Sequence, residues 1–118
     1  MSRPARAIIN LSNLRHNLQI AQSLSPQSKS IAVVKANGYG HGLKEVALAL
    51  DSDTDAIAVA CIEEALELRA TGVKSPIIIL EGYFDESEIK VAVTYDFCLV
   101  LSTLDSVETL LKMKFKKK

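Results

Sequence analysis

Four short apolar runs recur along the chain at nearly regular intervals. They begin at residues 31, 56, 77 and 97, so successive runs start 25, 21 and 20 residues apart. Continuous apolar runs of this length are typical of strands that are buried on both faces, and segments with helical periodicity separate them. The pattern therefore predicts an α/β fold built of parallel βα repeats.

The expected elements can be placed by their start and stop signals. We expect strands over residues 31–35, 56–60, 77–80 and 97–101, with a further short strand over 7–9. Helices are expected after Ser12 as N-cap and before Pro26, and over 43–50, 62–71 (ended by Gly72), 86–94 and 106–113. Parallel strands joined by helical crossovers form either an open doubly wound sheet or a barrel, and periodicity alone does not decide between them.

Length and charge exclude several classes of protein. A chain of 118 residues forms one domain at most, and its 14 basic residues balance its 14 acidic ones. We therefore expect no nucleic-acid partner. No leader and no apolar run near 18 residues is present, so we expect no membrane partner and a cytoplasmic location. Cys61 and Cys98 have no metal-ligand spacing, which predicts buried free thiols and no metal site.

The most informative segment is residues 33–42, which read VVKANGYGHG. Lys35 closes a buried run and opens onto a glycine-rich loop, and α/β folds place their chemistry at the carboxyl ends of strands. A primary amine there can form a Schiff base with an aldehyde such as pyridoxal phosphate. Taken singly, a lysine that closes a strand is more often a solvated charge, and the glycines are ordinary turn formers.

The complete string closely resembles the cofactor-lysine signature of the alanine racemases, which use pyridoxal phosphate. The resemblance continues through residues 58–60, 63–65, 68–69 and 76–82. It implies the first half of a (β/α)8 TIM-type barrel, in which the strand ending at Lys35 is the first strand of the barrel. It further implies that Lys35 holds the cofactor and exchanges the α-proton on the D-alanine side, and that the Tyr39 hydroxyl reaches the cofactor phosphate.

The implied activity is that of an isomerase: the interconversion of L- and D-alanine for peptidoglycan synthesis. A barrel of this type takes roughly 200–250 residues, so residues 1–118 would form a partial N-terminal domain that lacks the second half of the barrel and the carboxyl-terminal β domain. A second catalytic acid/base would lie in those parts. We therefore expect this chain by itself to be inactive, and to form a homo-oligomer or to pair with a complementary half. The alternatives are a non-catalytic module that binds pyridoxal phosphate and an inactive remnant.

Other polar residues have simpler interpretations. His41 has no metal partner nearby in the sequence, so a structural hydrogen bond is favoured over proton transfer. Leu80 is compatible with two positions in a barrel: lining the opening at the carboxyl ends of the strands, or packing in the core. Glu63, Glu64 and Glu67 lie near an expected helix start, where the helix dipole and a solvated helix face explain them without a role in the site.

Overall fold

The computed structural model describes residues 3–113. After an initial helix, each strand is followed by one helix, except the first strand, which is followed by two. The elements, in chain order, are α1 (Leu11–Leu24), β1 (Ile31–Val33), α2 (Lys35–Tyr39), α3 (Leu43–Leu50), β2 (Ala56–Val59), α4 (Ile62–Thr71), β3 (Ile77–Ile79), α5 (Glu86–Tyr95), β4 (Cys98–Leu99) and α6 (Leu104–Lys112).

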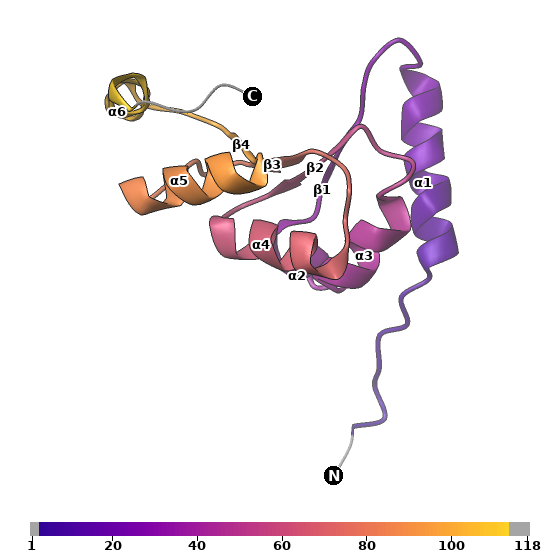
Figure 1. The fold of residues 1–118 in the computed structure, drawn as a ribbon. Coiled ribbons are helices and arrows are strands. Elements are labelled where there is room, and N and C mark those ends of the chain that lie inside the picture. Colours follow the sequence, from indigo (N-terminus) through magenta and orange to yellow (C-terminus); the bar gives the residue numbers. More distant parts are fainter. Residues whose placement is uncertain (1–2, 114–118) are drawn as a thin grey trace.

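The four strands form one parallel sheet in the order β1-β2-β3-β4. Helices α3, α4 and α5 lie on the same side of this sheet, while α1 stands beside α3 at one end and α6 lies beyond β4 at the other (Figure 1). In a doubly wound sheet the strand order reverses at a switch point and helices cover both faces. The strictly sequential order seen here is that of a barrel wall, because each right-handed crossover continues in the same direction.

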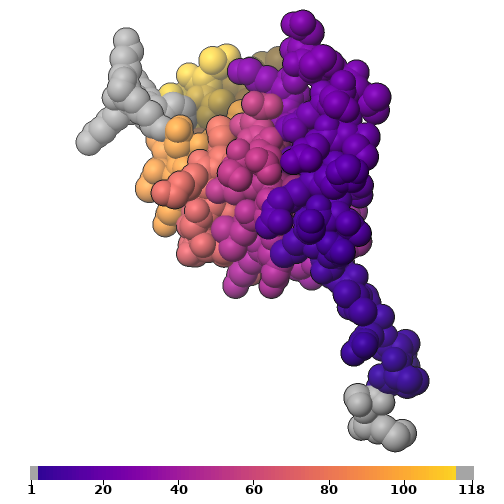
Figure 2. All heavy atoms as spheres, turned by 90° about the vertical axis from the view of Figure 1, so that its right-hand side faces the viewer, coloured from indigo at the N-terminus to yellow at the C-terminus, as the bar shows by residue number. Residues whose placement is uncertain are grey.

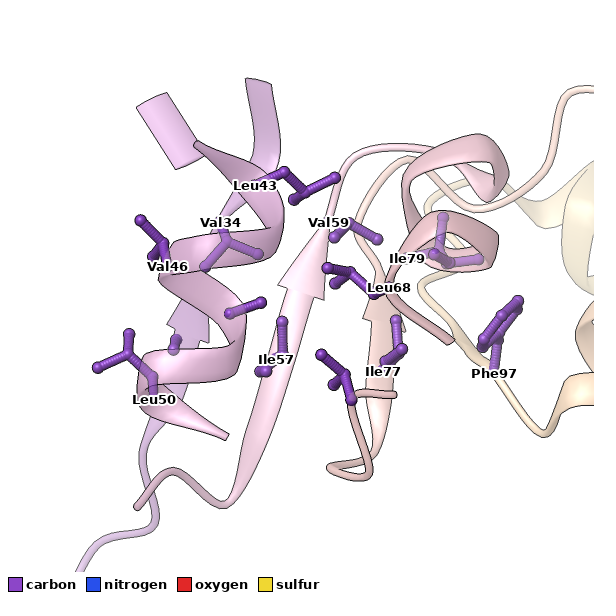
Figure 3. Close-up of a cluster of buried hydrophobic side chains, with 14 of the residues drawn as sticks. Val34, Leu43, Val46, Leu50, Ile57, Val59, Leu68, Ile77, Ile79 and Phe97 are labelled. Atoms are coloured by element: carbon purple, nitrogen blue, oxygen red, sulfur yellow. The ribbon is translucent and has the colours of Figure 1, made fainter. Parts of the chain in front are cut away.

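The hydrophobic core lies between the sheet and these helices (Figure 3). The register pairs Ala32 with Ile57 and Ile57 with Ile77, so alternate residues of each strand face the helices together. The helices contribute apolar side chains from one face each, including Val46 and Leu68. The side chains labelled in Figure 3 are Val34, Leu43, Val46, Leu50, Ile57, Val59, Leu68, Ile77, Ile79 and Phe97.

The opposite face of the sheet, which we call the open face, is only partly covered. The register places on it Ile31, Val33, Ala58, Ile78 and Cys98. Ile31 is 53% exposed and Val33 is 39% exposed. Cys98 is exposed as well, which corrects the prediction of a buried thiol, because the residues described here place no second layer over this face.

The predictions for the amino-terminal segment are wrong in two details. Residues 7–9 form no strand: they are exposed and belong to an extended segment that projects from the body of the molecule (Figure 2). Helix α1 is capped by Asn10, whose side chain accepts from the amide of Asn13 at 2.9 Å, and not by Ser12. Asn and Ser are about equally good N-caps, so composition alone did not identify which residue would serve.

The remaining predicted elements are confirmed, with shifted ends. Helices α3 and α4 have the predicted bounds, and Gly72 ends α4 in the left-handed conformation. Helix α6 begins earlier, at Leu104, because Thr103 and Ser106 form a reciprocal capping box. The first strand ends at Val33 and does not continue to Lys35, since the chain turns sharply there.

Candidate functional site

The carboxyl end of β1 leads into an unusual left-handed turn. Val34 makes the final backbone bond to β2, from its amide to the Ala58 carbonyl at 2.9 Å. The next residues then have positive φ values: 53° at Ala36, 57° at Asn37, 62° at Gly38 and 55° at Tyr39. A non-glycine residue in this conformation costs roughly 1–2 kcal/mol, and such strain concentrates at functional sites.

Hydrogen bonds within the segment hold the turn. The amide of Gly38 donates to the Val34 carbonyl at 2.8 Å, and the amide of Gly42 donates to the Asn37 carbonyl at 2.9 Å. The side-chain oxygen of Asn37 accepts from the amide of Leu43 at 2.9 Å, which satisfies the first amide of α3. Asparagine suits this position because it tolerates the left-handed conformation better than most other residues.

A second brace comes from α4. Glu64 Oε2 accepts from the amide of Ala36 at 2.9 Å, and Glu64 Oε1 accepts from the amide of Ala60 at 2.8 Å. The interpretation of Glu64 as a solvated residue of the helix start is therefore wrong, whereas Glu67 does form a surface ion pair with Lys44 at 3.6 Å. The sequence did contain a signal for this role of Glu64. It is the third residue of a helix that follows a strand, and a carboxylate at that position can reach back to preceding amides.

Lys35 lies at the carboxyl end of β1, two residues beyond the strand, and opens the left-handed turn. Its side chain is half-buried. Within residues 3–113 the single ion pair joins Lys44 to Glu67, so the Lys35 amine is not committed to a carboxylate. A lysine amine is a side chain that can condense with a carbonyl compound.

Tyr39 ends the same turn and is 58% exposed. It borders a groove of about 380 Å³ that includes Val33 and His41 and is closed on the far side by α1. His41 Nδ1–H donates to the Tyr39 carbonyl at 3.1 Å, so the structural hydrogen bond predicted for His41 is present. Leu80, just beyond β3, is 37% exposed in this chain.

Cys61 lies beside the turn, just before α4, and its pKa is shifted. Burial raises the pKa of the Cys61 thiol, and the neighbouring Glu63 and Glu64 raise it further against one hydrogen bond that lowers it. The thiol therefore stays protonated at neutral pH and is a poor nucleophile. The part of the chain described here holds no cluster of three or more His, Cys, Asp or Glu residues that could bind a metal ion. None of its helices is long and apolar enough to cross a membrane.

Comparisons with known proteins agree with this geometry. Residues 9–118 match the family described as alanine racemase, N-terminal domain. A catabolic alanine racemase of Pseudomonas putida is 48% identical over 115 residues, which are 98% of this chain and 32% of that protein. An alanine racemase of Legionella pneumophila is 49% identical over 112 residues, covering 95% of this chain and 31% of the relative. The chain thus spans about a third of the length of the relatives that it matches.

Solved structures show the same fold. The biosynthetic alanine racemase of Pseudomonas aeruginosa superposes with a TM-score of 0.81 at 46% identity, over 86% of this chain and 28% of that one. The alanine racemase of Acinetobacter baumannii superposes with a TM-score of 0.84 at 39% identity, over 88% of this chain and 29% of that one. The predicted fold class, parallel βα repeats forming the first half of a (β/α)8 barrel, is confirmed by these matches and by the strand order. The chain belongs to the alanine racemase family, since residues 9–118 match the model of that family's N-terminal domain.

Proposed function

We propose that this chain supplies the cofactor-holding lysine of an alanine racemase, and that the protein to which it contributes interconverts L- and D-alanine. The observation that carries the proposal is Lys35, which is half-buried and opens a strained turn at the carboxyl end of β1. Relatives called catabolic and biosynthetic are similarly close, at 48% and 46% identity. The proposal therefore concerns the interconversion of L- and D-alanine, and peptidoglycan synthesis is the expected use of the D-alanine formed.

The residues present fit pyridoxal phosphate. The ε-amine of Lys35 would hold it through its aldehyde carbon. The Tyr39 hydroxyl, on the exposed end of the same turn, would donate a hydrogen bond to the phosphate without adding a charge. Bound pyridoxal phosphate acts as an electron sink for the α-carbon of an amino acid.

Lys35 would also move the proton. Its ε-amine would take a proton from the α-carbon of the amino acid and return it. Inversion requires a second acid/base on the opposite face of that carbon. We assign that group, along with the second half of the barrel and the carboxyl-terminal β domain, to the two thirds of the relatives' length that this chain does not match.

This assignment of the second acid/base predicts the activity of the 118-residue chain by itself. It should not racemise alanine measurably, because a missing acid/base typically costs about 10²- to 10⁴-fold and the lost positioning adds to this. We propose a second copy or a complementary half as its partner, and a cytoplasmic location. The racemase is favoured over a non-catalytic cofactor-binding module because the relatives at 46–49% identity carry the racemase name.

Covalent labelling tests the proposal. The full chain is treated with pyridoxal phosphate, reduced with borohydride and mapped by peptide mass spectrometry. We expect the label on Lys35, its loss in Lys35→Ala, and its retention in Lys44→Ala, which removes a surface lysine of α3 that pairs with Glu67. Labelling of Lys90 with Lys35 unmodified would contradict the assignment.

A further inference from the structure

We propose that Glu64 is a positioning residue for Lys35, because its carboxylate fixes the backbone from which the lysine side chain leaves the sheet. The inference rests on the proposed function of Lys35 and adds to it a residue on a different element, α4. Glu64 itself is half-buried at the start of that helix.

The hydrogen-bond ladder between β1 and β2 breaks where the turn begins. The amide of Val34 donates to Ala58 at 2.9 Å, and in a parallel pair the next bond would run from the amide of Ala60 to the Val34 carbonyl. That carbonyl accepts from Gly38 at 2.8 Å, since the chain has turned left-handed. The amides of Ala60 and Ala36 then both require another acceptor.

One carboxylate satisfies both amides. Glu64 Oε1 accepts from Ala60 at 2.8 Å, and Oε2 accepts from Ala36 at 2.9 Å. Bonds from backbone amides to a charged oxygen are stronger than those between neutral groups. The Glu64 carboxylate therefore takes the place of a missing backbone hydrogen bond between β1 and β2 and joins the carboxyl ends of these two strands.

The bond to Ala36 acts directly on Lys35. A peptide unit is planar, so the Ala36 amide lies in one plane with the Lys35 carbonyl group and the Lys35 Cα atom. An acceptor that fixes this amide fixes the plane on the carboxyl side of Lys35, and the bond from the Gly38 amide to the Val34 carbonyl at 2.8 Å holds the plane on the other side. With both planes held, the backbone angles of Lys35 are restrained, and so is the direction in which its side chain departs. Ala36 has a φ of 53°, a conformation that the backbone does not favour, so an external tie is required at this position.

The chemistry predicts which substitution is informative. Glutamine has nearly the same size and shape as glutamate but offers one oxygen and one NH₂ group. In Glu64→Gln one amide keeps its acceptor while the other faces a donor, so one tie is lost without a change in volume. Glu63→Gln is the matched control, because Glu63 lies in the same first turn of α4 and is exposed.

The experiment uses the full chain with two readouts. The first is the rate at which pyridoxal phosphate forms an adduct on Lys35, followed by absorbance and located by borohydride mapping. We expect Glu64→Gln to slow it by roughly 10- to 100-fold, the range expected for a misplacement of about 1 Å, and Glu63→Gln to leave it unchanged. The second is amide hydrogen exchange by NMR, in which Ala36 or Ala60 should exchange at least about 10-fold faster in Glu64→Gln, with the amides of α3 unaffected.

The outcomes separate this inference from the proposed function. Unchanged exchange at both amides in Glu64→Gln would overturn the tie. Faster exchange at Ala36 with an unchanged labelling rate would overturn the positioning role and leave Glu64 purely structural. A wild-type chain that forms no adduct on Lys35 while both amides remain protected would overturn the function proposed for Lys35 and support the tie. If Glu64→Gln loses the circular dichroism of the folded chain, Glu64→Asp, which keeps the charge but is one methylene shorter, is judged by the same two readouts.

Discussion

Ser75 donates both its backbone amide and its hydroxyl to the carboxylate of Asp51, at 2.9 and 2.6 Å. The amide of Lys74 adds a third bond to Asp51 at 2.9 Å. Asp51 directly follows α3, and Ser75 lies just before β3. The three bonds thus tie the chain together at the ends of the strands opposite to Lys35.

This tie predicts a pH-dependent stability. Burial alone would raise the pKa of Asp51, but the bonds from Ser75 and Lys74 and the charge of Arg69 together hold it below its usual value of 3.8. The pKa is lower in the folded state than in the unfolded state, so the contribution is fully present above pH 3.8 and is lost as the pH falls through the folded-state pKa. Urea unfolding of Asp51→Asn should show a smaller loss of stability on acidification than wild type. Asp53→Asn, two residues away and exposed, should follow the wild-type curve.

Asn37 combines a left-handed backbone with a side-chain cap, and two substitutions separate these roles. Asn37→Ala loses the cap on Leu43 and places a less tolerant residue at a φ of 57°, so we expect a loss of about 1–3 kcal/mol in the free energy of unfolding. Asn37→Gly loses the cap but adopts the conformation freely, so its loss should be smaller. Denaturant unfolding measures both, with Asn17→Ala on the exposed side of α1 as a control. Equal losses in the two Asn37 variants would show that backbone conformation plays no part.

Gly38 and Gly40 test whether space or conformation limits the turn. A Cβ at Gly38, where φ is 62°, would lie 3.4 Å from Val46 Cγ2, whereas at Gly40, where φ is 85°, no atom lies within 4 Å. Both alanine variants bear a conformational cost of roughly 1–2 kcal/mol, and Gly38→Ala bears the crowding as well. Thermal unfolding should therefore rank Gly38→Ala below Gly40→Ala. The reverse order would indicate that α3 shifts to admit the methyl group.

The open face predicts self-association. Ile31 and Val33 expose 53% and 39% of their surface, and burial of one such side chain contributes roughly 1.5–3 kcal/mol. The β1 edge also presents unpaired backbone groups. Light scattering after size exclusion should give a concentration-dependent mass above that of the monomer, and a lower mass for the double variant Ile31→Thr, Val33→Thr. Leu24→Gln, which alters an equally apolar residue on α1 that is 81% exposed, is the control. A dilute, cooperatively unfolding monomer would contradict this expectation.

Local pattern was sufficient for the elements of this fold. The apolar runs predicted four strands because a strand meant to be buried on both faces has no polar residues to alternate with, and β1 to β4 lie within those runs. Gly72 predicted the end of α4 because a left-handed residue there has no Cβ cost. The lysine motif of residues 33–42 likewise led to the family by sequence alone, because its residues are contiguous.

Only the tertiary structure determined which distant parts of the chain lie next to one another and form hydrogen bonds. Strand order distinguished a barrel wall from a doubly wound sheet, since both have the same local periodicity. Lys35 was predicted to end a strand but begins the left-handed turn, in which the amide of Ala36 donates to Glu64, 28 residues away in the sequence. The place of Glu64 at a helix start indicates a bond to a nearby amide such as that of Ala60, but no local pattern indicates the bond to Ala36. Only the packing of α4 beside the end of β1 brings the Glu64 carboxylate within hydrogen-bond distance of both amides.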